Sequence, residues 1–152
     1  MQKFFKLLRT IRTSKSGFTT LELMIVIVII GIITAVSIPR LMKMLDTGKV
    51  TACKKAVEQI TVQLEVYNMH NQTYPTTEQG LKALVEPATI DPVPANFQEG
   101  GYLSNKDLKD PWGRDFIYRS PGDSSRNFEI LSYGSDGKEG GTGNAADIKS
   151  WD

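Results

Sequence analysis

The sequence has very few of the residues that most often carry enzyme chemistry. Cys53 is the only cysteine and His70 the only histidine among 152 residues. A single cysteine excludes a disulfide within the chain and a metal site made of several cysteines. No serine or cysteine stands in a pattern typical of a nucleophile, and the glycines at 140–143 lack the lysine and the following helix of a phosphate-binding loop. The sequence therefore predicts that the protein is not an enzyme, and that His70 lies at the surface or caps a helix end.

Two stretches near the N-terminus each lack charge of one sign. Residues 1–17 contain no acidic residue and five basic ones: Lys3, Lys6, Arg9, Arg12 and Lys15. The rest of the chain has 13 basic and 17 acidic groups, a net charge of −4. Residues 18–38 carry one charge, Glu22, and as a helix they would extend about 31 Å, the thickness of a bilayer core. The pattern predicts a membrane span at 18–38, and it argues against a free cytosolic enzyme or a nucleic-acid-binding protein.

A basic stretch followed by an apolar run has two general interpretations. The first is a cleaved secretory signal with Ala35-Val36-Ser37 as its cleavage site, but this places Glu22 inside the apolar run and Pro39 just after the cut. The second is a plain signal anchor, whose basic residues keep the N-terminus in the cytoplasm. The signal anchor leaves Glu22 and Gly17 without a role.

A third interpretation gives both residues a role. The segment Lys15-Ser16-Gly17-Phe18-Thr19-Thr20-Leu21-Glu22 resembles the prepilin-peptidase site of type IV pilins and type II secretion pseudopilins. The resemblance implies that a membrane protease cuts between Gly17 and Phe18, methylates the new N-terminus of Phe18 and leaves the apolar segment in place. Residues 1–17 would be the cleaved leader, and Glu22 would become the fifth residue of the mature chain.

The position of Glu22 supports this interpretation on physical grounds. A carboxylate inside an apolar helix costs a few kcal/mol on insertion scales and normally needs a partner. No cation lies on its helical face within the chain, because its neighbours there are Leu21, Ile25, Val26 and Ile29. The amine of a cleaved Phe18 on a neighbouring copy would supply the missing charge. The alternative is a glutamate that reaches the cytoplasmic headgroups by itself.

Residues 39–73 are predicted to form a second, amphipathic stretch of helix. Apolar residues recur there at intervals of three and four, as in the seam of a helix packed on one side: Val50, Cys53, Val57, Ile60, Leu64 and Tyr67. This seam would pack on the domain that follows, in preference to forming a free coiled coil, with Cys53 as a core residue. Because Pro39 removes a backbone donor, we expect the helix to kink or unwind near residues 35–39.

Residues 74–152 are predicted to form a small globular head. Thr76 with Gln79 three residues later is a capping-box pattern, which predicts a short helix over 76–85 that stops before Pro87. Asp110-Pro111-Trp112-Gly113 fits a type I turn. The β-rich runs 116–119 and 127–133, separated by Pro121-Gly122-Asp123, predict a hairpin. The fold class is therefore α+β, a long helix with a membrane half and an amphipathic half, packed on a head that ends in a long polar loop.

Motifs in the head narrow the resemblance to the major pseudopilins of type II secretion systems. They are Tyr74-Pro75-Thr76-Thr77-Glu78-Gln79-Gly80-Leu81, Asp110-Pro111-Trp112-Gly113, Tyr133-Gly134-Ser135-Asp136-Gly137 and Ala146-Asp147-Ile148-Lys149-Ser150-Trp151. The resemblance implies a single-pass inner-membrane subunit with residues 39–152 in the periplasm. Copies would assemble into a periplasmic helical fibre, the pseudopilus, whose growth helps export proteins across the outer membrane. The implied partners are minor pseudopilins, the prepilin peptidase, an inner-membrane platform protein and, indirectly, a cytoplasmic secretion ATPase.

The polar loop after Tyr133 is the one candidate ligand site. Carboxylate and amide oxygens in a glycine-rich stretch suit calcium, although the spacing is not that of an EF-hand and a solvated loop is the alternative. The resemblance favours calcium, because major pseudopilins bind it in this loop. The implied ligands are Asp136 and the backbone carbonyl of Tyr133, then Asp147 as the second carboxylate. Glu139 and Asn144 are reserves, because the family position seven residues after Asp136 is Gly143 here.

Two other functions compete with a secretion fibre subunit. A type IV major pilin for adhesion or motility shares the N-terminal motif, but such pilins often close a C-terminal loop with a disulfide that one cysteine cannot form. A periplasmic enzyme on a signal anchor belongs to another class, and the absence of a catalytic constellation in the sequence argues against it.

Overall fold

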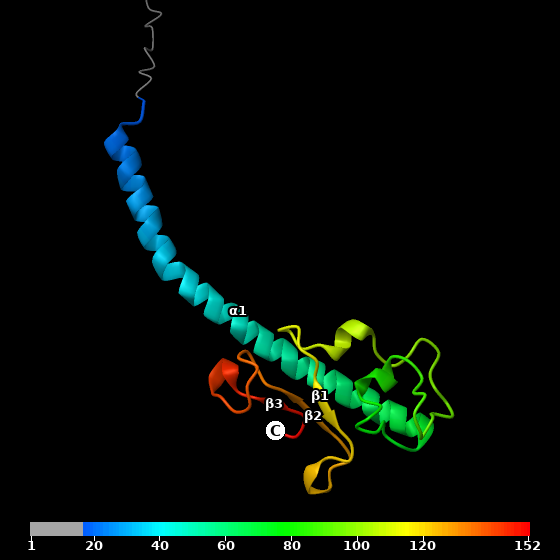
Figure 1. The fold of residues 1–152 in the computed structure, drawn as a ribbon. Helices are drawn as coiled ribbons and strands as arrows, with labels where there is room; N and C mark the ends of the chain where they lie inside the picture. Colours follow the sequence, from blue (N-terminus) through cyan, green and yellow to red (C-terminus); the bar gives the residue numbers. More distant parts are fainter. Residues whose placement is uncertain (1–16) are drawn as a thin grey trace, which may run out of the picture. The chain divides into compact units, whose positions relative to one another are not determined.

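The computed structural model describes residues 17–152, so the basic leader other than Gly17 lies outside the described residues. One long helix, α1, spans Thr20–Asn71 and precedes a head of short 3-10 helices and strands (Figure 1). In chain order these are η1 (Leu81–Leu84), η2 (Asn105–Leu108), β1 (Ile117–Arg119), η3 (Asp123–Ser125), β2 (Glu129–Ser132), η4 (Gly143–Ala145) and β3 (Ile148–Lys149). The predicted α+β class is confirmed.

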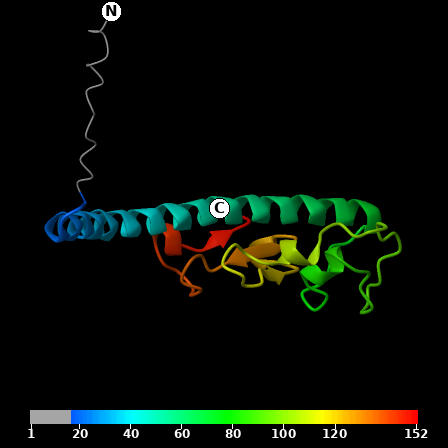
Figure 2. The same ribbon diagram turned by 90° about the horizontal axis from the view of Figure 1, so that it is seen from above.

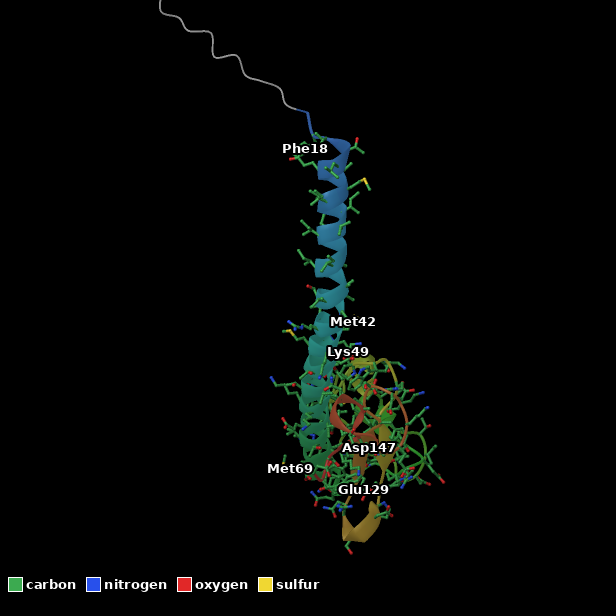
Figure 3. All side chains as sticks on the ribbon, turned by 90° about the vertical axis from the view of Figure 1, so that its left-hand side faces the viewer. Phe18, Met42, Lys49, Met69, Glu129 and Asp147 are labelled. Carbon is green, nitrogen blue, oxygen red and sulfur yellow. The ribbon has the colours of Figure 1, made fainter. Side chains whose placement is uncertain are left out.

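The contacts of the chain divide it into two units after Arg40. In the first unit, the apolar side chains of α1 project outward on all sides of the helix (Figure 3). Exposed fractions there run from 43% at Val26 to 68% at Leu21 within the helix. Among residues 17–152, α1 is the one helix long and apolar enough to cross a membrane, and none of its apolar window is buried. The predicted span is thus an unpartnered helix surface in the isolated chain.

Pro39 lies inside α1, and helical structure continues through it. The unwinding considered for residues 35–39 is therefore absent from this structure. A proline inside a helix removes one backbone donor and crowds the carbonyl four residues earlier, but helical structure can continue where the neighbouring groups adjust.

The seam predicted from the apolar spacing is confirmed in the second unit. Cys53, Val57, Ile60, Leu64 and Tyr67 are all at most 4% exposed, and Val50 packs against this cluster at its edge. Figure 2 shows the elements of the head on one side of this part of α1. Burial raises the pKa of the Cys53 thiol, so the side chain stays protonated and behaves as a core residue.

The segment after α1 follows the sequence prediction at its start and departs from it at Gly80. The Thr76 hydroxyl accepts the Gln79 N–H at 3.2 Å, and the Gln79 side chain accepts the Thr76 N–H at 2.9 Å, so the capping box is present. Gly80 then adopts φ +61°, outside the right-handed helical region, and the chain continues as the 3-10 helix η1. The short helix predicted over 76–85 is a turn followed by η1, because Gly80 breaks it in two.

Three antiparallel strands form the sheet, in the order β1-β2-β3. The predicted hairpin is confirmed by the pairing of Tyr118 with Ile130, which places both side chains on the face that contacts α1. β3 pairs with β2 through Ser132 and Ile148, and Ile148 completes the buried face. The sequence prediction missed β3, because two residues next to a glycine-rich loop give no alternating pattern.

The predicted turn at Asp110 is also present. The Gly113 N–H donates to the Asp110 carbonyl at 2.9 Å, and Gly113 has φ +87°. The Asp110 side chain is 2% exposed and accepts hydrogen bonds from the N–H groups of Trp112 and Arg114 and from the Ser132 hydroxyl. A buried carboxylate with this many donors ties the turn to β2.

We predict that the seam of α1 stabilises the second unit independently of the membrane span, because every residue of the core cluster lies between Cys53 and Ile148. In the fragment Leu41–Asp152, Leu64→Ala should lower the free energy of unfolding by about 2–5 kcal/mol, since it leaves a cavity at a fully buried site. Val62→Ala is the matched control on the exposed face of the same helix, where the side chain is 56% exposed. Urea unfolding followed by circular dichroism measures both, and equal effects of the two substitutions would contradict the packing described here.

Candidate functional site

The expected cleavage site lies at the start of the described residues. Phe18 is 83% exposed and precedes the first turn of α1. A Cβ added at Gly17 would meet nothing within 4 Å among residues 17–152. The fold of residues 17–152 therefore does not require a glycine at position 17 for steric reasons. Lys15 and Ser16, the rest of the motif, lie outside the described residues.

Glu22 lies in the first turn of α1. Its backbone N–H donates to the Thr19 hydroxyl at 3.2 Å, and the Leu23 N–H donates to the Thr19 carbonyl, so Thr19 caps the helix. The Glu22 carboxylate makes no hydrogen bond or ion pair with any of residues 17–152. An acidic group in the first turn is favourable for the helix dipole, but it leaves the charge without a cationic partner in this part of the chain.

The sequence analysis did not single out Thr19 as a helix cap. The signal was available, because threonine followed three residues later by glutamate is a capping-box pattern, of which the structure forms the hydrogen bond to the Thr19 hydroxyl. The cap places the start of α1 two residues after the expected cleavage point. The helix can therefore begin in the same way in a mature chain that starts at Phe18.

The polar loop after β2 is closed by its own backbone. The Gly137 N–H donates to the Tyr133 carbonyl at 3.2 Å, and the Ser135 N–H donates to the Asn144 carbonyl at 3.2 Å. The Gly140 N–H lies 3.1 Å from both carboxylate oxygens of Asp147. These bonds fold residues 134–147 into a loop whose two ends meet beside the sheet.

The structure brings three of the predicted calcium ligands to one place and leaves two outside it. Tyr133, Glu139 and Asp147 line a polar hollow on the outer side of the sheet, and Asp147 is labelled in Figure 3. Asp136 is exposed outside this hollow, and its carboxylate accepts the Lys138 N–H at 3.1 Å. The Asn144 side chain lies 3.4 Å from the Thr47 hydroxyl and so fastens η4 to α1.

A cluster of charged and aromatic side chains borders the same hollow and was not predicted. Arg126 pairs with the buried Glu129 at 2.6 Å, and its guanidinium lies 4.8 Å from the centre of the Trp151 ring. Lys149 lies 5.7 Å from that ring on the same side of the sheet. Trp151 is therefore held by β3 and by cation–π contacts within the chain. The sequence signal was weak, since these residues are separated by up to 25 positions.

His70 has the surface position that the sequence predicted. It is exposed in the last turn of α1, and its Nδ1 lies 3.0 Å from the Tyr102 hydroxyl. The His70 carbonyl accepts a hydrogen bond from the Asn96 side chain at 3.2 Å, which helps to finish the helix.

Comparison with known proteins decides the family. The family described as "Type II secretion system (T2SS), protein G" matches residues 40–151. The chain belongs to this family. It is 44% identical to the type II secretion system core protein G of Pseudomonas aeruginosa over 93% of this chain and 98% of that protein. It is also 44% identical to the core protein G of Vibrio cholerae over 90% of this chain and 92% of that protein.

A solved structure gives the same result for the fold. The chain is similar to the major pseudopilin from the type 2 secretion system of enterohaemorrhagic Escherichia coli, with 36% identity and a TM-score of 0.60. The match covers 74% of this chain and 95% of that structure. The predicted resemblance to type II secretion major pseudopilins is confirmed, and the type IV major pilin is disfavoured. The family is one of structural subunits and is not a known enzyme family.

Proposed function

We propose that this protein is the repeating subunit of a type II secretion pseudopilus, a helical fibre that grows in the periplasm and helps to move proteins across the outer membrane. The proposal rests on the part of α1 that lies in the first unit of the chain. Its apolar side chains are exposed on every face, and Glu22, the single charge among residues 18–38, has no partner among residues 17–152. Membership of the protein G family supplies the secretion context.

The exposed apolar surface of the helix would be covered by different partners before and after assembly. Before assembly, the acyl chains of the inner membrane would cover it, since the apolar stretch matches the bilayer core. After assembly, the same helices of other copies would cover it. A fibre that extends without closing needs head-to-tail contacts between different surfaces of identical subunits, and a lone apolar rod with a one-sided head provides two unlike surfaces.

The charge distribution suggests the orientation. Five basic residues before the span and none of the opposite sign favour a cytoplasmic N-terminus, which places residues 39–152 in the periplasm. Processing by the prepilin peptidase would then occur at the cytoplasmic face, between Gly17 and Phe18. The work of fibre growth would come from the cytoplasmic secretion ATPase through the platform protein, and minor pseudopilins would join the same fibre.

Calcium is the ligand that we propose for the loop at 134–147. The donor chemistry fits, because the loop offers carboxylates and backbone carbonyls, which are the oxygen ligands that calcium accepts in irregular geometry. The Tyr133 carbonyl has one lone pair open beyond its bond to Gly137. Residues 17–152 contain no group of three His, Cys, Asp or Glu side chains placed to hold a metal ion. Backbone carbonyls would therefore supply most of the ligands, with Asp147 and Asp136 as the charged ones and Glu139 or Asn144 in reserve.

Gly17→Leu should block processing without disturbing the fold. The substituted side chain meets nothing within 4 Å in the described chain, so any loss must arise in the protease, whose site would require a close approach of backbone. We expect a membrane-inserted protein that keeps residues 1–17 and forms no fibre. Mass spectrometry of the N-terminus measures the outcome, and normal cleavage of this variant would refute the assignment of the site.

Glu22→Ala should permit cleavage and membrane insertion but impair fibre growth. Its proposed partner, the amine of Phe18 on a neighbouring copy, exists only after processing. Pseudopilus length and exoprotein secretion are the readouts, with N-terminal methylation as the check on processing. Glu99→Ala, which removes an exposed carboxylate from a loop of the head, is the matched control and should assemble normally. Normal fibres from Glu22→Ala would exclude charge pairing as the function of this residue.

Calcium should raise the melting temperature of the fragment Leu41–Asp152. An ion that binds only the folded state adds about 2.7 kcal/mol at 100 times its dissociation constant. Asp136→Ala should abolish the difference between millimolar calcium and chelator, and magnesium should substitute poorly because it requires a more regular octahedral site. Differential scanning fluorimetry on Trp112 and Trp151 measures the shift. Identical melting curves with calcium and with chelator would leave this segment as a solvated loop.

A further inference from the structure

Arg114 connects the turn at Asp110 to the start of the polar loop. Its Nη2 donates to the Gly134 carbonyl, and its Nε lies 3.4 Å from Asp110 Oδ2. A Cβ added at Gly137 would clash with the guanidinium, so this side chain fills the space that the glycine leaves free. Arg114 thus lies against both ends of the turn at residues 134–137.

Asp110 holds Arg114 in this position. Its buried carboxylate accepts the Arg114 N–H at 2.9 Å, and the Asp110 N–H donates to the Arg114 carbonyl at 2.7 Å. The same carboxylate is fixed to β2 through the Ser132 hydroxyl at 2.9 Å. Because the backbone and the side chain of Arg114 are both anchored, the guanidinium is placed by the folded core and not by the loop.

Gly134, whose carbonyl accepts the hydrogen bond from Arg114, lies where the two ends of the loop meet. Gly134 has φ +58°, and a Cβ there would be 2.5 Å from the Ala146 carbonyl oxygen. Gly134 directly follows Tyr133, and Ala146 directly precedes Asp147. Both neighbours are proposed ligands. A displacement of Gly134 would therefore move the two sides of the proposed ion site relative to each other.

The charge of Arg114 does not prevent a second cation from binding nearby. The side chain forms a salt bridge with the buried Asp110, which offsets its charge, and at 37% exposure it also faces water. The planar fork of arginine can donate to a carboxylate and a carbonyl at once, which a lysine cannot do with the same geometry. We therefore expect Arg114 to affect calcium binding more by arranging the loop than by repelling the ion.

We infer that Arg114 is a positioning residue for the ion site, and that it holds residues 134–137 in the conformation that binds calcium. This inference rests on the calcium binding proposed above. Without the guanidinium, the binding conformation would be only a fraction of the loop's population, and the dissociation constant would rise by the inverse of that fraction.

The test is calcium titration by isothermal calorimetry on the mature full-length chain in detergent micelles, after removal of metal with chelator. Arg114→Gln should raise the dissociation constant by about tenfold or more, if the binding conformation falls to a tenth of the population. Arg114→Lys keeps the charge but loses the two-point contact, and it should also bind more weakly than the wild type. Lys109→Gln removes a positive charge next to the turn at Asp110. Among residues 17–152, Lys109 forms a salt bridge with the exposed Asp115 alone, so this variant should leave the affinity unchanged.

A second pair of variants tests the position of the guanidinium while keeping the arginine. Gly137→Ala would push the guanidinium aside, whereas an alanine Cβ at Gly100, outside the polar loop, meets nothing within 4 Å, so Gly100→Ala is the matched control. Both glycines have positive φ, so both variants carry a backbone cost, but only Gly137→Ala should weaken calcium binding strongly. Near-ultraviolet circular dichroism at the titration temperature shows whether each head is folded.

The outcomes separate the two proposals. If the wild type takes up no calcium, the ion site itself is wrong and the role of Arg114 is wrong with it. If the wild type binds and Arg114→Gln and Gly137→Ala bind equally well, the site stands and the positioning role is overturned. Tighter binding by Arg114→Gln with unchanged binding by Arg114→Lys would show that repulsion dominates, which also overturns the inference.

Discussion

The packing of one face of α1 on the sheet is the interaction on which the head depends. Five seam residues from Cys53 to Tyr67 are buried, and each buried side chain of this size contributes about 1.5–3 kcal/mol. The strands are only two to four residues long and could not persist without this surface. Tyr118, Ile130 and Ile148 give one residue from each strand to the contact. The helix is therefore both the core of the head and the continuation of the span, which places the strongest constraint on its sequence.

A second constraint is the buried carboxylate of Asp110. Removing a carboxylate from water is costly, and the cost is offset here by two backbone N–H groups, a hydroxyl and a guanidinium. These donors come from the turn with the adjoining Arg114 and from β2, so one side chain joins these two segments. Apolar packing sets where the sheet lies, and this polar network sets the conformation of the connections at its edge.

The features that the sequence predicted well are those with a local or periodic signal. The seam could be predicted because its 3-4 spacing extends over six residues. The capping box at Thr76 and the turn at Asp110 could be predicted because their hydrogen-bond partners lie within four positions in the sequence. The prediction of a helix over 76–85 was wrong, because the capping box indicates only where a helix begins. Gly80 prevents this one from continuing. β3 and the contact between Arg114 and Gly134 depend on pairings across 16 to 20 residues, for which a single sequence carries no local pattern.

The same contrast between local and long-range signals explains why the sequence predicts one candidate site more fully than the other. Glu22 stands out in the sequence because a charge in an apolar run is conspicuous. The structure adds the cap at Thr19, and residues 17–152 supply no partner for the carboxylate. The loop proposed to bind calcium is the opposite case. Its composition allows many ligand sets, and the fold reduces them by joining Asp147 to Gly140 and turning Asn144 toward Thr47. The first site leaves a requirement that residues 17–152 do not meet, because an apolar helix surface with one charge needs a partner that covers it. The second site is a polar loop with few apolar side chains, which needs polar contacts or a bound ion to order it. Assembly would meet the first requirement in the membrane and the fibre. The second can be met in part within the head, because Arg114 already brings a cation from the core to the base of the loop.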